Sequence, residues 1–351
     1  MTALNPREEI VSLLRGYFTC PLISFLGKRG ILDKMIDREF KSSDFTEIIN
    51  NDMFVKILMY FESIGIIQRG RGEDIFCATE IGNKIFKRYG SFCLLHSYGS
   101  FLNLLEKVLF DKEYTEQPRV DRVENVVGSG QINNRKYFSH ALDMIRGNAM
   151  PLTLIDVGCG NGTFIKSVLK HASDCQVIGV DISRQALEEA EKNIRAEHKN
   201  AALKTILSDG REVSRWLGEG MDAHKSKKTK SLVITMWYLI HEISQKKSAE
   251  VVDFLNEIYA IAPRAEIVIG EITSVSADIL AFNKNESIMP EFLFFHGISG
   301  QGVLTWEEYQ NILSRVPYTL KAEKLFDMMA YGEKSIPSGF IWQLTPKKGG
   351  I

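Results

Sequence analysis

The sequence predicts an α/β protein whose second half holds a mainly parallel sheet and whose first part is mainly helical. From residue 153 onward, apolar strand-like runs alternate with amphipathic helical runs, which is typical of parallel strands joined by crossover helices. Before residue 112 the apolar residues recur mostly at helical spacing, as Phe54, Leu58 and Phe61 do. A chain of 351 residues is long enough for about two domains.

The helical front segment also contains a candidate β-hairpin, from Ile66 to Ala78, with its turn at residues 70–74. Helices followed by a short hairpin are typical of winged-helix modules, which either bind DNA or serve for dimerisation. Residues 1–112 carry 15 Lys and Arg against 14 Asp and Glu, so this segment lacks the basic surface that phosphates require. We therefore expect a winged-helix-like dimerisation or lid domain at residues 1–112, and a homodimer formed through it.

A polar linker and a connecting helix are expected over residues 113–145, and a second domain over residues 146–351. The polar, lysine-rich residues 221–230 are interpreted as a solvated loop. The last two strands, separated only by a loop, are expected to pair antiparallel at the sheet edge. The seven expected strands of this domain are Thr153–Val157, Gln176–Asp181, Leu203–Ser208, Ser231–Trp237, Glu266–Ile272, Tyr318–Leu325 and Ser338–Leu344.

The overall composition argues against nucleic-acid and membrane partners. The formal net charge is −1, so the chain has no global field that would attract polyanions or anionic lipid. The N-terminus lacks a secretion-signal pattern, and we expect no segment that spans a membrane. The five cysteines are scattered and odd in number, which is typical of free thiols in a reducing cytoplasm.

The stretch from Leu152 to Gly162 organises the second domain. Apolar and β-branched residues lead to Asp156, and then Gly158, Gly160 and Gly162 stand at alternate positions before a helical run. A strand, a glycine turn and a helix form the first half of a nucleotide-binding unit, because the backbone there must approach the ligand closely. Alone, such a glycine triplet is a weak indication of binding.

Three acidic residues at successive predicted strand ends make the indication stronger. Asp156 ends the first strand, and Asp181 ends the second, 19 residues after Gly162, where a carboxylate meets a ribose diol. Asp209 follows the third strand, in position to accept from an adenine amino group. A hydride-transferring enzyme of this fold has Gly-x-Gly-x-x-Gly instead, and Asp156 would repel a pyrophosphate.

These residues resemble those of the class I S-adenosylmethionine-dependent methyltransferases. The matching segments are Asp156-Val-Gly-Cys-Gly-Asn-Gly162, Gly179-Val-Asp-Ile-Ser183 and Ser208-Asp-Gly210. The resemblance implies a Rossmann-like, seven-stranded methyltransferase sheet with S-adenosylmethionine as methyl donor. It further implies that the donor is bound by Asp156, Gly158, Gly160, Gly162, Asp181, Ile182, Ser208, Asp209, Gly210 and Trp237.

Two histidines are candidates for the acceptor side of the site. His241 and Glu242 follow the fourth predicted strand, and His296 lies in a connection of over 30 residues between residues 274 and 304. A connection of that length inside a compact domain is usually functional. Two histidines and a carboxylate are ligands that Fe²⁺ or Zn²⁺ accepts. Because adjacent residues point apart on a regular helix, Glu242 is either a metal ligand or a group that orients a histidine.

The sequence around His241 and His296 resembles that of the metal-dependent 2-oxo-acid C-methyltransferases, which include phenylpyruvate and 2-ketoarginine β-methyltransferases. This resemblance implies that a 2-oxo acid is held on a divalent metal as its enolate and methylated at its β-carbon. Tyr238 or a metal-bound hydroxide would remove the β proton.

The side chain of the substrate is less well indicated. Glu286 and Glu291 would receive a guanidinium, as in 2-ketoarginine, whereas Phe295 would line an aromatic pocket. An alternative function is a metal-independent O-methyltransferase that uses a histidine as general base. A third alternative is a DNA-binding regulator without enzymatic activity.

Overall fold

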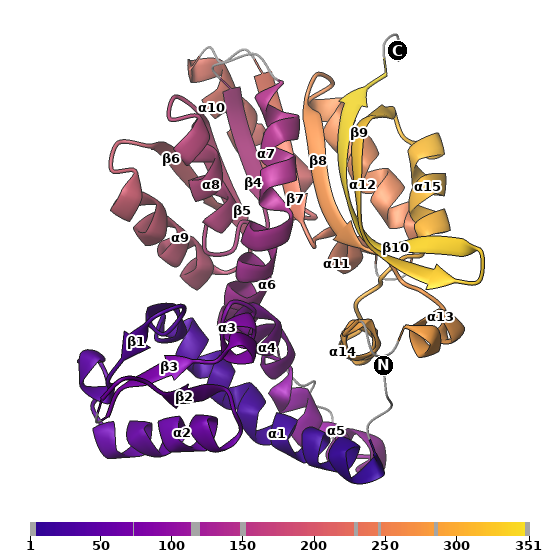
Figure 1. Ribbon diagram of the computed structural model, residues 1–351. Helices are drawn as coiled ribbons and strands as arrows, with labels where there is room; N and C mark the ends of the chain where they lie inside the picture. The colour runs from indigo at the N-terminus through magenta and orange to yellow at the C-terminus, as the bar shows by residue number, and fades with distance from the viewer. Residues whose placement is uncertain are drawn as a thin grey trace. The chain divides into compact units, whose positions relative to one another are not determined.

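The computed structural model describes residues 5–72, 74–113, 120–147, 152–227, 231–244, 247–283 and 287–347. The chain forms two compact units, residues 1–132 and residues 133–351, which are described separately (Figure 1). Residues 133–145, expected in the connecting segment, lie in the second unit.

The first unit is mainly helical, with a small sheet in the order β1-β3-β2. Its helices are α1 (Pro6–Lys28), α2 (Asn51–Ser63), α3 (Glu80–Phe86), α4 (Tyr89–His96), α5 (Gly99–Phe110) and most of α6 (Arg122–Lys136). Its strands are β1 (Glu39–Phe40), β2 (Ile67–Arg69) and β3 (Phe76–Ala78). Strands β2 and β3 pair antiparallel, which confirms the predicted hairpin. Apolar residues of α2 at helical spacing, Phe54, Leu58 and Phe61, are buried in the core of the unit.

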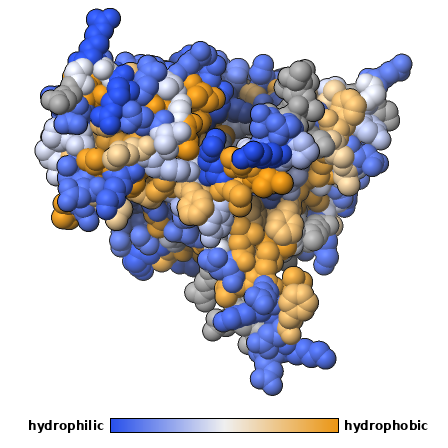
Figure 2. Space-filling model, turned by 60° about the horizontal axis from the view of Figure 1, so that its bottom comes forward, coloured by the Kyte–Doolittle hydropathy of each residue, from blue (hydrophilic) through white to orange (hydrophobic). Residues whose placement is uncertain are grey.

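Helix α1 begins with a capping box at Asn5 and Glu8, and much of its apolar surface is exposed. Leu13 and Tyr17 are 77% and 78% exposed. On length and composition α1 could cross a membrane, with a mean hydropathy of 1.4 over 18 residues. This is weak evidence, because core helices and signal sequences pass the same test. Figure 2 shows hydrophobic residues gathered in patches between hydrophilic ones on the face turned to the viewer.

The second unit contains a seven-stranded sheet in the order β6-β5-β4-β7-β8-β10-β9. Strands β4 to β8 run parallel, whereas β10 pairs antiparallel with both β8 and β9. The parallel sheet and the antiparallel pairing of the last two strands are therefore confirmed. The strands are β4 (Leu152–Val157), β5 (Gln176–Asp181), β6 (Ala202–Leu207), β7 (Ser231–Trp237), β8 (Glu266–Ile272), β9 (Tyr318–Tyr331) and β10 (Lys334–Pro346).

Helices cover both faces of this sheet (Figure 1). On one face α10 (Val213–Lys227) packs against α12 (Ser248–Ile261), and α12 packs against α15 (Trp306–Arg315). On the other face α8 (Thr163–His171) packs between α7 (Phe138–Arg146) and α9 (Arg184–Glu197). The central strands β4 and β5 are apolar and buried almost throughout, as a parallel sheet covered on both faces requires.

Two segments differ from the expectation. Residues 221–227 belong to α10 and do not form a loop, because they continue an amphipathic helix whose Trp216 and Leu217 are buried. Residues 228–230 of the expected loop lie outside the described residues. Strands β9 and β10 extend through residues 328–337, expected as a loop, and turn only at Gly332, which has a φ of 62°.

The long connection after β8 contains two helices, α13 (Ala277–Phe282) and α14 (Met289–Ile298). Ile279 and Met289 from these helices pack with Met329 of β9 in a small apolar cluster. The two ends of the connection meet, because the Ser274 N–H donates to the Leu304 carbonyl at 2.7 Å. The connection is therefore a closed excursion from the carboxyl edge of the sheet.

Candidate active site

The turn after β4 is built by glycines in left-handed conformations. Gly158, Gly160 and Gly162 have φ values of 73°, 53° and 77°, which residues with a Cβ adopt only at a cost. The N–H of Gly158 donates to the carbonyl of Val180 at 2.8 Å, so the turn is anchored on β5. A Cβ on Gly162 would lie 2.9 Å from Cδ1 of Ile194, so α9 packs directly against the turn.

Asp181 ties the glycine turn to the end of β5. One of its carboxylate oxygens accepts from the N–H of Gly160 at 3.0 Å, and the other accepts from the N–H of Ser183 at 2.8 Å. Ile182, between Asp181 and Ser183, is 63% exposed. The carboxylate therefore fixes the backbone beside the position where the sequence predicts a ribose.

Asp209 lies after β6 and is paired with a neighbouring cation. Arg211 Nη2 lies 2.6 Å from one carboxylate oxygen, and this guanidinium lowers the pKa of Asp209. An adenine amino group would have to share the carboxylate with Arg211. Ser208 is buried, and a Cβ on Gly210 would lie 3.2 Å from Cδ2 of Leu239.

Asp156 is a buried carboxyl group at the centre of this edge. It is 1% exposed, and its Oδ1 accepts from the Thr235 hydroxyl at 2.6 Å. Burial raises the pKa of Asp156 to about 7, and the negative charge of Asp181 adds to the effect. Two acidic groups here disfavour a phosphate-bearing ligand and favour a cationic one.

Trp237 ends β7 within a cluster of aromatic rings. The ring centroid of Phe138 lies 4.9 Å from that of Trp237, and the centroid of Phe164 lies 5.0 Å away. The buried indole Nε1 of Trp237 has no hydrogen-bond partner among the described residues. A buried donor of this kind usually serves a ligand or a water. Together with the glycine turn and the acidic strand ends, it fits a bound S-adenosylmethionine.

Tyr238 turns the chain sharply at the end of β7. Its φ of 51° is unusual for a bulky residue and is a form of backbone strain that concentrates at functional sites. Its N–H donates to the Gly270 carbonyl at 2.9 Å, and its ring packs edge-on against Tyr137. Desolvation raises the pKa of Tyr238 well above its usual range, which makes it a poor general base. Its expected role as a base therefore lacks support.

His241 is the first predicted acceptor-side residue, and its partner is Glu271. His241 lies in α11 (Ile240–Ser244) and is 3% exposed, while Glu271 at the end of β8 is 2% exposed. The Nδ1 of His241 lies 2.9 Å from Oε1 of Glu271, and the His241 N–H donates to Oε2 at 3.2 Å. The Ile272 N–H also donates to this carboxylate. Glu271 thus acts purely as an acceptor and orients the imidazole.

Glu271 is a residue of the candidate site that the sequence analysis missed. The indication was available, because Glu271 is a carboxylate inside the apolar run of residues 267–272 at a parallel-strand end. Its companion is 30 positions away, so only the pairing of β7 with β8 identifies the contact.

His296 lies beside His241, as the sequence analysis expected of two residues at one site. Their ring centroids are 5.0 Å apart, with the planes at 77°. The His296 Nδ1 lies 2.7 Å from the Phe292 carbonyl, so Nδ1 carries the proton. Phe292 also stacks on the ring at 3.8 Å. Burial lowers the pKa of His296 to about 3, with His241 contributing, so the imidazole is neutral at physiological pH.

Glu242 does not complete a metal-binding group with the two histidines. Its Oε1 accepts from the side-chain amide of Gln301 at 3.1 Å. Among the described residues, no group of three His, Cys, Asp or Glu side chains is arranged to hold a metal ion. Two of the three expected ligands are adjacent, but the described residues give no support for a complete metal site.

The expected substrate residues lie in or near α14. Phe295 is buried next to His296, whereas Glu291 is exposed on the first turn of the helix. Glu286 lies outside the described residues. Glu291 and Phe295 thus lie about one turn apart on α14, and of the two only Phe295 is buried.

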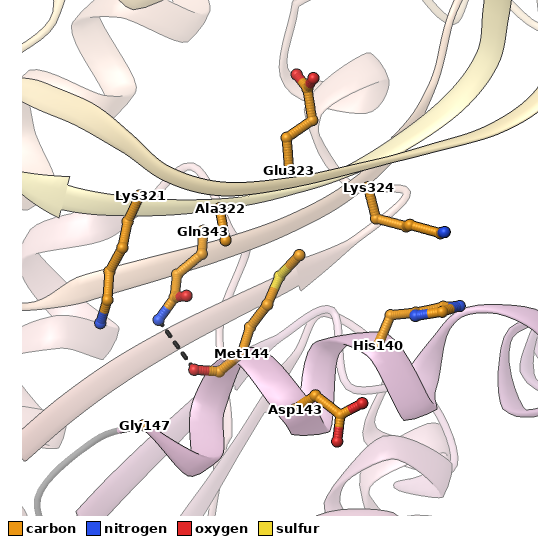
Figure 3. A pocket seen from close by; sticks show the side chains of 9 residues that line it. All are labelled: His140, Asp143, Met144, Gly147, Lys321, Ala322, Glu323, Lys324 and Gln343. Carbon is orange, nitrogen blue, oxygen red and sulfur yellow. Dashed lines mark hydrogen bonds between the residues drawn. The ribbon is translucent and has the colours of Figure 1, made fainter.

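A separate pocket lies between α7 and the strands β9 and β10. Figure 3 shows Gln343 reaching from β10 to the carbonyl of Met144, a contact of 3.0 Å. His140 and Lys324 extend along one side of it. None of the sequence-predicted site residues lines this pocket.

Comparisons with known proteins agree with this fold. Residues 155–262 match the family of methyltransferase domains. No curated protein sequence gives a significant match. A putative O-methyltransferase from Nostoc punctiforme has a similar structure, with a TM-score of 0.60 at 12% identity over 98% of this chain and all of that one.

Two further structures are similar over nearly their whole length. Human N-acetylserotonin methyltransferase, solved with S-adenosylmethionine, gives a TM-score of 0.59 at 12% identity, covering 99% of each chain. An O-methyltransferase family protein from Burkholderia thailandensis gives 0.58 at 11% identity, covering 99% of this chain and all of that one. The match over residues 155–262 identifies a methyltransferase domain in the second unit, and the acidic, glycine-rich sheet edge lies within the matched residues.

Proposed function

We propose that the enzyme methylates a hydroxyl oxygen of a small molecule, with His241 as the general base. The single observation that carries this proposal is the buried contact of 2.9 Å between His241 Nδ1 and Glu271 Oε1. A carboxylate that holds a histidine in one orientation and one tautomer is a recurring arrangement for general-base catalysis. The proposal thus adopts the O-methyltransferase alternative of the sequence analysis.

The tautomer determines what His241 can do. A proton on Nδ1, donated to Glu271, leaves the basic lone pair on Nε2. As a hydroxyl approaches, Nε2 takes its proton, and the negative charge of Glu271 stabilises the imidazolium that forms. Bound S-adenosylmethionine supplies a methyl group on a positively charged sulfonium, which is the electrophile.

His296 contributes a second, neutral imidazole beside His241. Its low pKa keeps it from competing as a cation for Glu271, and its ring with that of Phe292 forms an apolar wall. Such a wall orients the acceptor and excludes water. Holding two reactants in attack geometry supplies on the order of 7–11 kcal/mol of the barrier reduction.

The test is product analysis with isotopically labelled S-adenosylmethionine and a panel of hydroxylated aromatic compounds and 2-oxo acids. Mass spectrometry with fragmentation locates the methyl group on oxygen or carbon. We expect O-methyl products, activity that survives exhaustive chelation, and loss of activity in His241→Ala. Methyl found only on carbon contradicts the proposal.

A second candidate is C-methylation of a 2-oxo acid such as 2-ketoarginine on a divalent metal. The specific observation in its favour is the adjacency of His241 and His296, with ring centroids 5.0 Å apart. The incomplete donor set around Glu242 counts against it. It predicts bound Fe²⁺ or Zn²⁺ that is lost in His241→Ala and His296→Ala, with the methyl group on the β-carbon.

We also propose a homodimer formed through the first unit. The exposed apolar side chains of α1 support it, because Leu13 and Tyr17 belong to a surface that a second copy can cover. Sedimentation analysis of Leu13→Asp and Tyr17→Asp tests this, and an unchanged molecular mass contradicts it. A cytoplasmic location is supported by the five cysteines, which are all free of disulfides.

A further inference from the structure

Two consecutive peptide N–H groups donate hydrogen bonds to the backbone carbonyls of the two histidines. The N–H of Gln301 donates to the carbonyl of His296 at 3.0 Å. The next N–H, that of Gly302, donates to the carbonyl of His241, also at 3.0 Å. His296 belongs to α14 and His241 to α11, so two adjacent peptide groups join two helices that are far apart in the sequence.

Side chains reinforce this junction on both sides. Toward α11, the Ser244 hydroxyl donates to the Gly302 carbonyl, and the Gln301 side-chain amide donates to Glu242. Toward α14, the Ser299 hydroxyl lies 3.2 Å from both the His296 carbonyl and Oε1 of Gln301. Ser244 is completely buried, so its contact is shielded from competing water.

Gly300 gives the junction its shape. Its φ is 76°, and a Cβ built on it would meet nothing within 4 Å. A substitution at Gly300 therefore acts on the backbone conformation and not through a steric clash. Substitutions at Gly300 can therefore test the backbone conformation of the turn without disturbing the packing around it.

We propose that residues 299–302 form a positioning clamp that sets the separation of the His241 and His296 imidazoles during methyl transfer. Gly300 and Gln301 are its positioning residues, and they act through the histidines. The inference rests on the proposed use of His241 as a base. It assigns the clamp a role in the rate of transfer and none in binding S-adenosylmethionine.

The kinetic test compares Gly300→Val with Gly300→Asn. Both variants place a side chain in open space, but asparagine tolerates the left-handed conformation and valine does not. We expect Gly300→Val to lower kcat about tenfold, the scale of the left-handed penalty, with the Kd for S-adenosylmethionine unchanged. Gly300→Asn should stay close to the parent enzyme. Equal kcat values for the two variants overturn the proposal.

A second measurement does not depend on activity. Imidazole nitrogen NMR signals of His241 and His296, assigned by single replacement of each, are recorded in the purified protein without substrate. We expect both signals to shift in Gly300→Val and in Gln301→Glu, which sets a carboxylate against Glu242, and to stay in place in Gly300→Asn. Unshifted signals overturn the clamp, as do shifted signals with unchanged kcat.

The two proposals fail in distinguishable ways. If the enzyme methylates carbon and not oxygen, the proposed function is wrong, while the imidazole comparison still decides the clamp. If Gly300→Val lowers the Tm so far that it is unfolded in the assay, Gln301→Glu supplies both the kinetic and the spectroscopic result.

Discussion

The proposed donor side and the proposed acceptor side of the same sheet edge are built in different ways. The donor side uses three short segments directly at the ends of β4, β5 and β6, and Asp181 contacts Ser183, two residues away, and Gly160, 21 residues away. The acceptor side joins β7, β8 and the 274–304 excursion, and its contacts are remote in sequence, such as His241 to Glu271 and Glu242 to Gln301. The proposed donor site is thus made of three short motifs, one at each of three strand ends. The proposed acceptor site is made of segments that can vary independently of these motifs.

The largest expected effect tests whether the acceptor side is separable from the donor side. We expect His241→Ala to lower kcat about 10²–10⁴-fold, the usual contribution of a general base. The Kd for S-adenosylmethionine, measured by calorimetry, should remain unchanged. His171→Ala, an exposed histidine on α8, is the control. A parallel loss of donor affinity in His241→Ala would mean that the two sides form one unit.

The next prediction concerns the buried charge on the donor side. Because burial raises the pKa of Asp156 from 3.8 to about 7, the folded state keeps a proton that the unfolded state releases between these pH values. The Asp156 contribution to stability therefore falls as pH rises from about 4 to about 7, by about 1 kcal/mol per pH unit. Denaturant unfolding of the parent protein and Asp156→Asn across this range checks it. A constant difference between the two proteins argues against a raised pKa.

A smaller effect is expected at Asp181, which organises the donor turn. Asp181→Ala leaves the N–H groups of Gly160 and Ser183 without their acceptor, and each such loss costs about 1–3 kcal/mol. We expect the Kd for S-adenosylmethionine to rise roughly 10–100-fold, with kcat at saturating donor within a few-fold of the parent. Asp174→Ala, exposed before β5, should leave both values unchanged. A change in kcat larger than the change in Kd would contradict a role of Asp181 confined to donor binding.

The smallest effect compares two glycines of the donor half. Gly162→Ala combines a left-handed φ with a Cβ 2.9 Å from Ile194, and we expect it to lower the free energy of unfolding by about 1–2 kcal/mol. Gly218, inside α10, has open space at its Cβ, so Gly218→Ala should stabilise by roughly 0.5–1 kcal/mol. Equal effects of the two variants in thermal unfolding would contradict the interpretation that the turn requires glycine at position 162.

The sequence was sufficient for the strands that end at the proposed donor side, because the evidence for them is periodic and local. Strand ends, alternate glycines and acidic residues occur within windows that one element spans, and β4, β5 and β7 lie within one residue of their expected bounds. The error in the same region, at residues 221–227, arose because the polar face of an amphipathic helix was interpreted as a loop. The interpretation considered polarity and overlooked helix propensity.

The acceptor side could be predicted only in part. The two histidines could be expected at one edge, since both follow parallel strands, and their rings do meet. The partner of His241 could not be read from the sequence, because the contact with Glu271 depends on the register of β8 beside β7. The orientation of Glu242 toward Gln301 depends on a turn that no local pattern specifies.

The closed ends of the 274–304 excursion have a consequence for engineering. Ser274 and Thr305 form a parallel bridge, and the Ser274 N–H reaches the Leu304 carbonyl at 2.7 Å. A segment whose ends already touch can be exchanged for another of different length at little entropic penalty, since loop-closure entropy changes slowly with length. The excursion can thus be replaced as a unit. Grafts joined at residues 274 and 304 offer a route to new acceptor specificity while the proposed donor-binding residues stay unaltered.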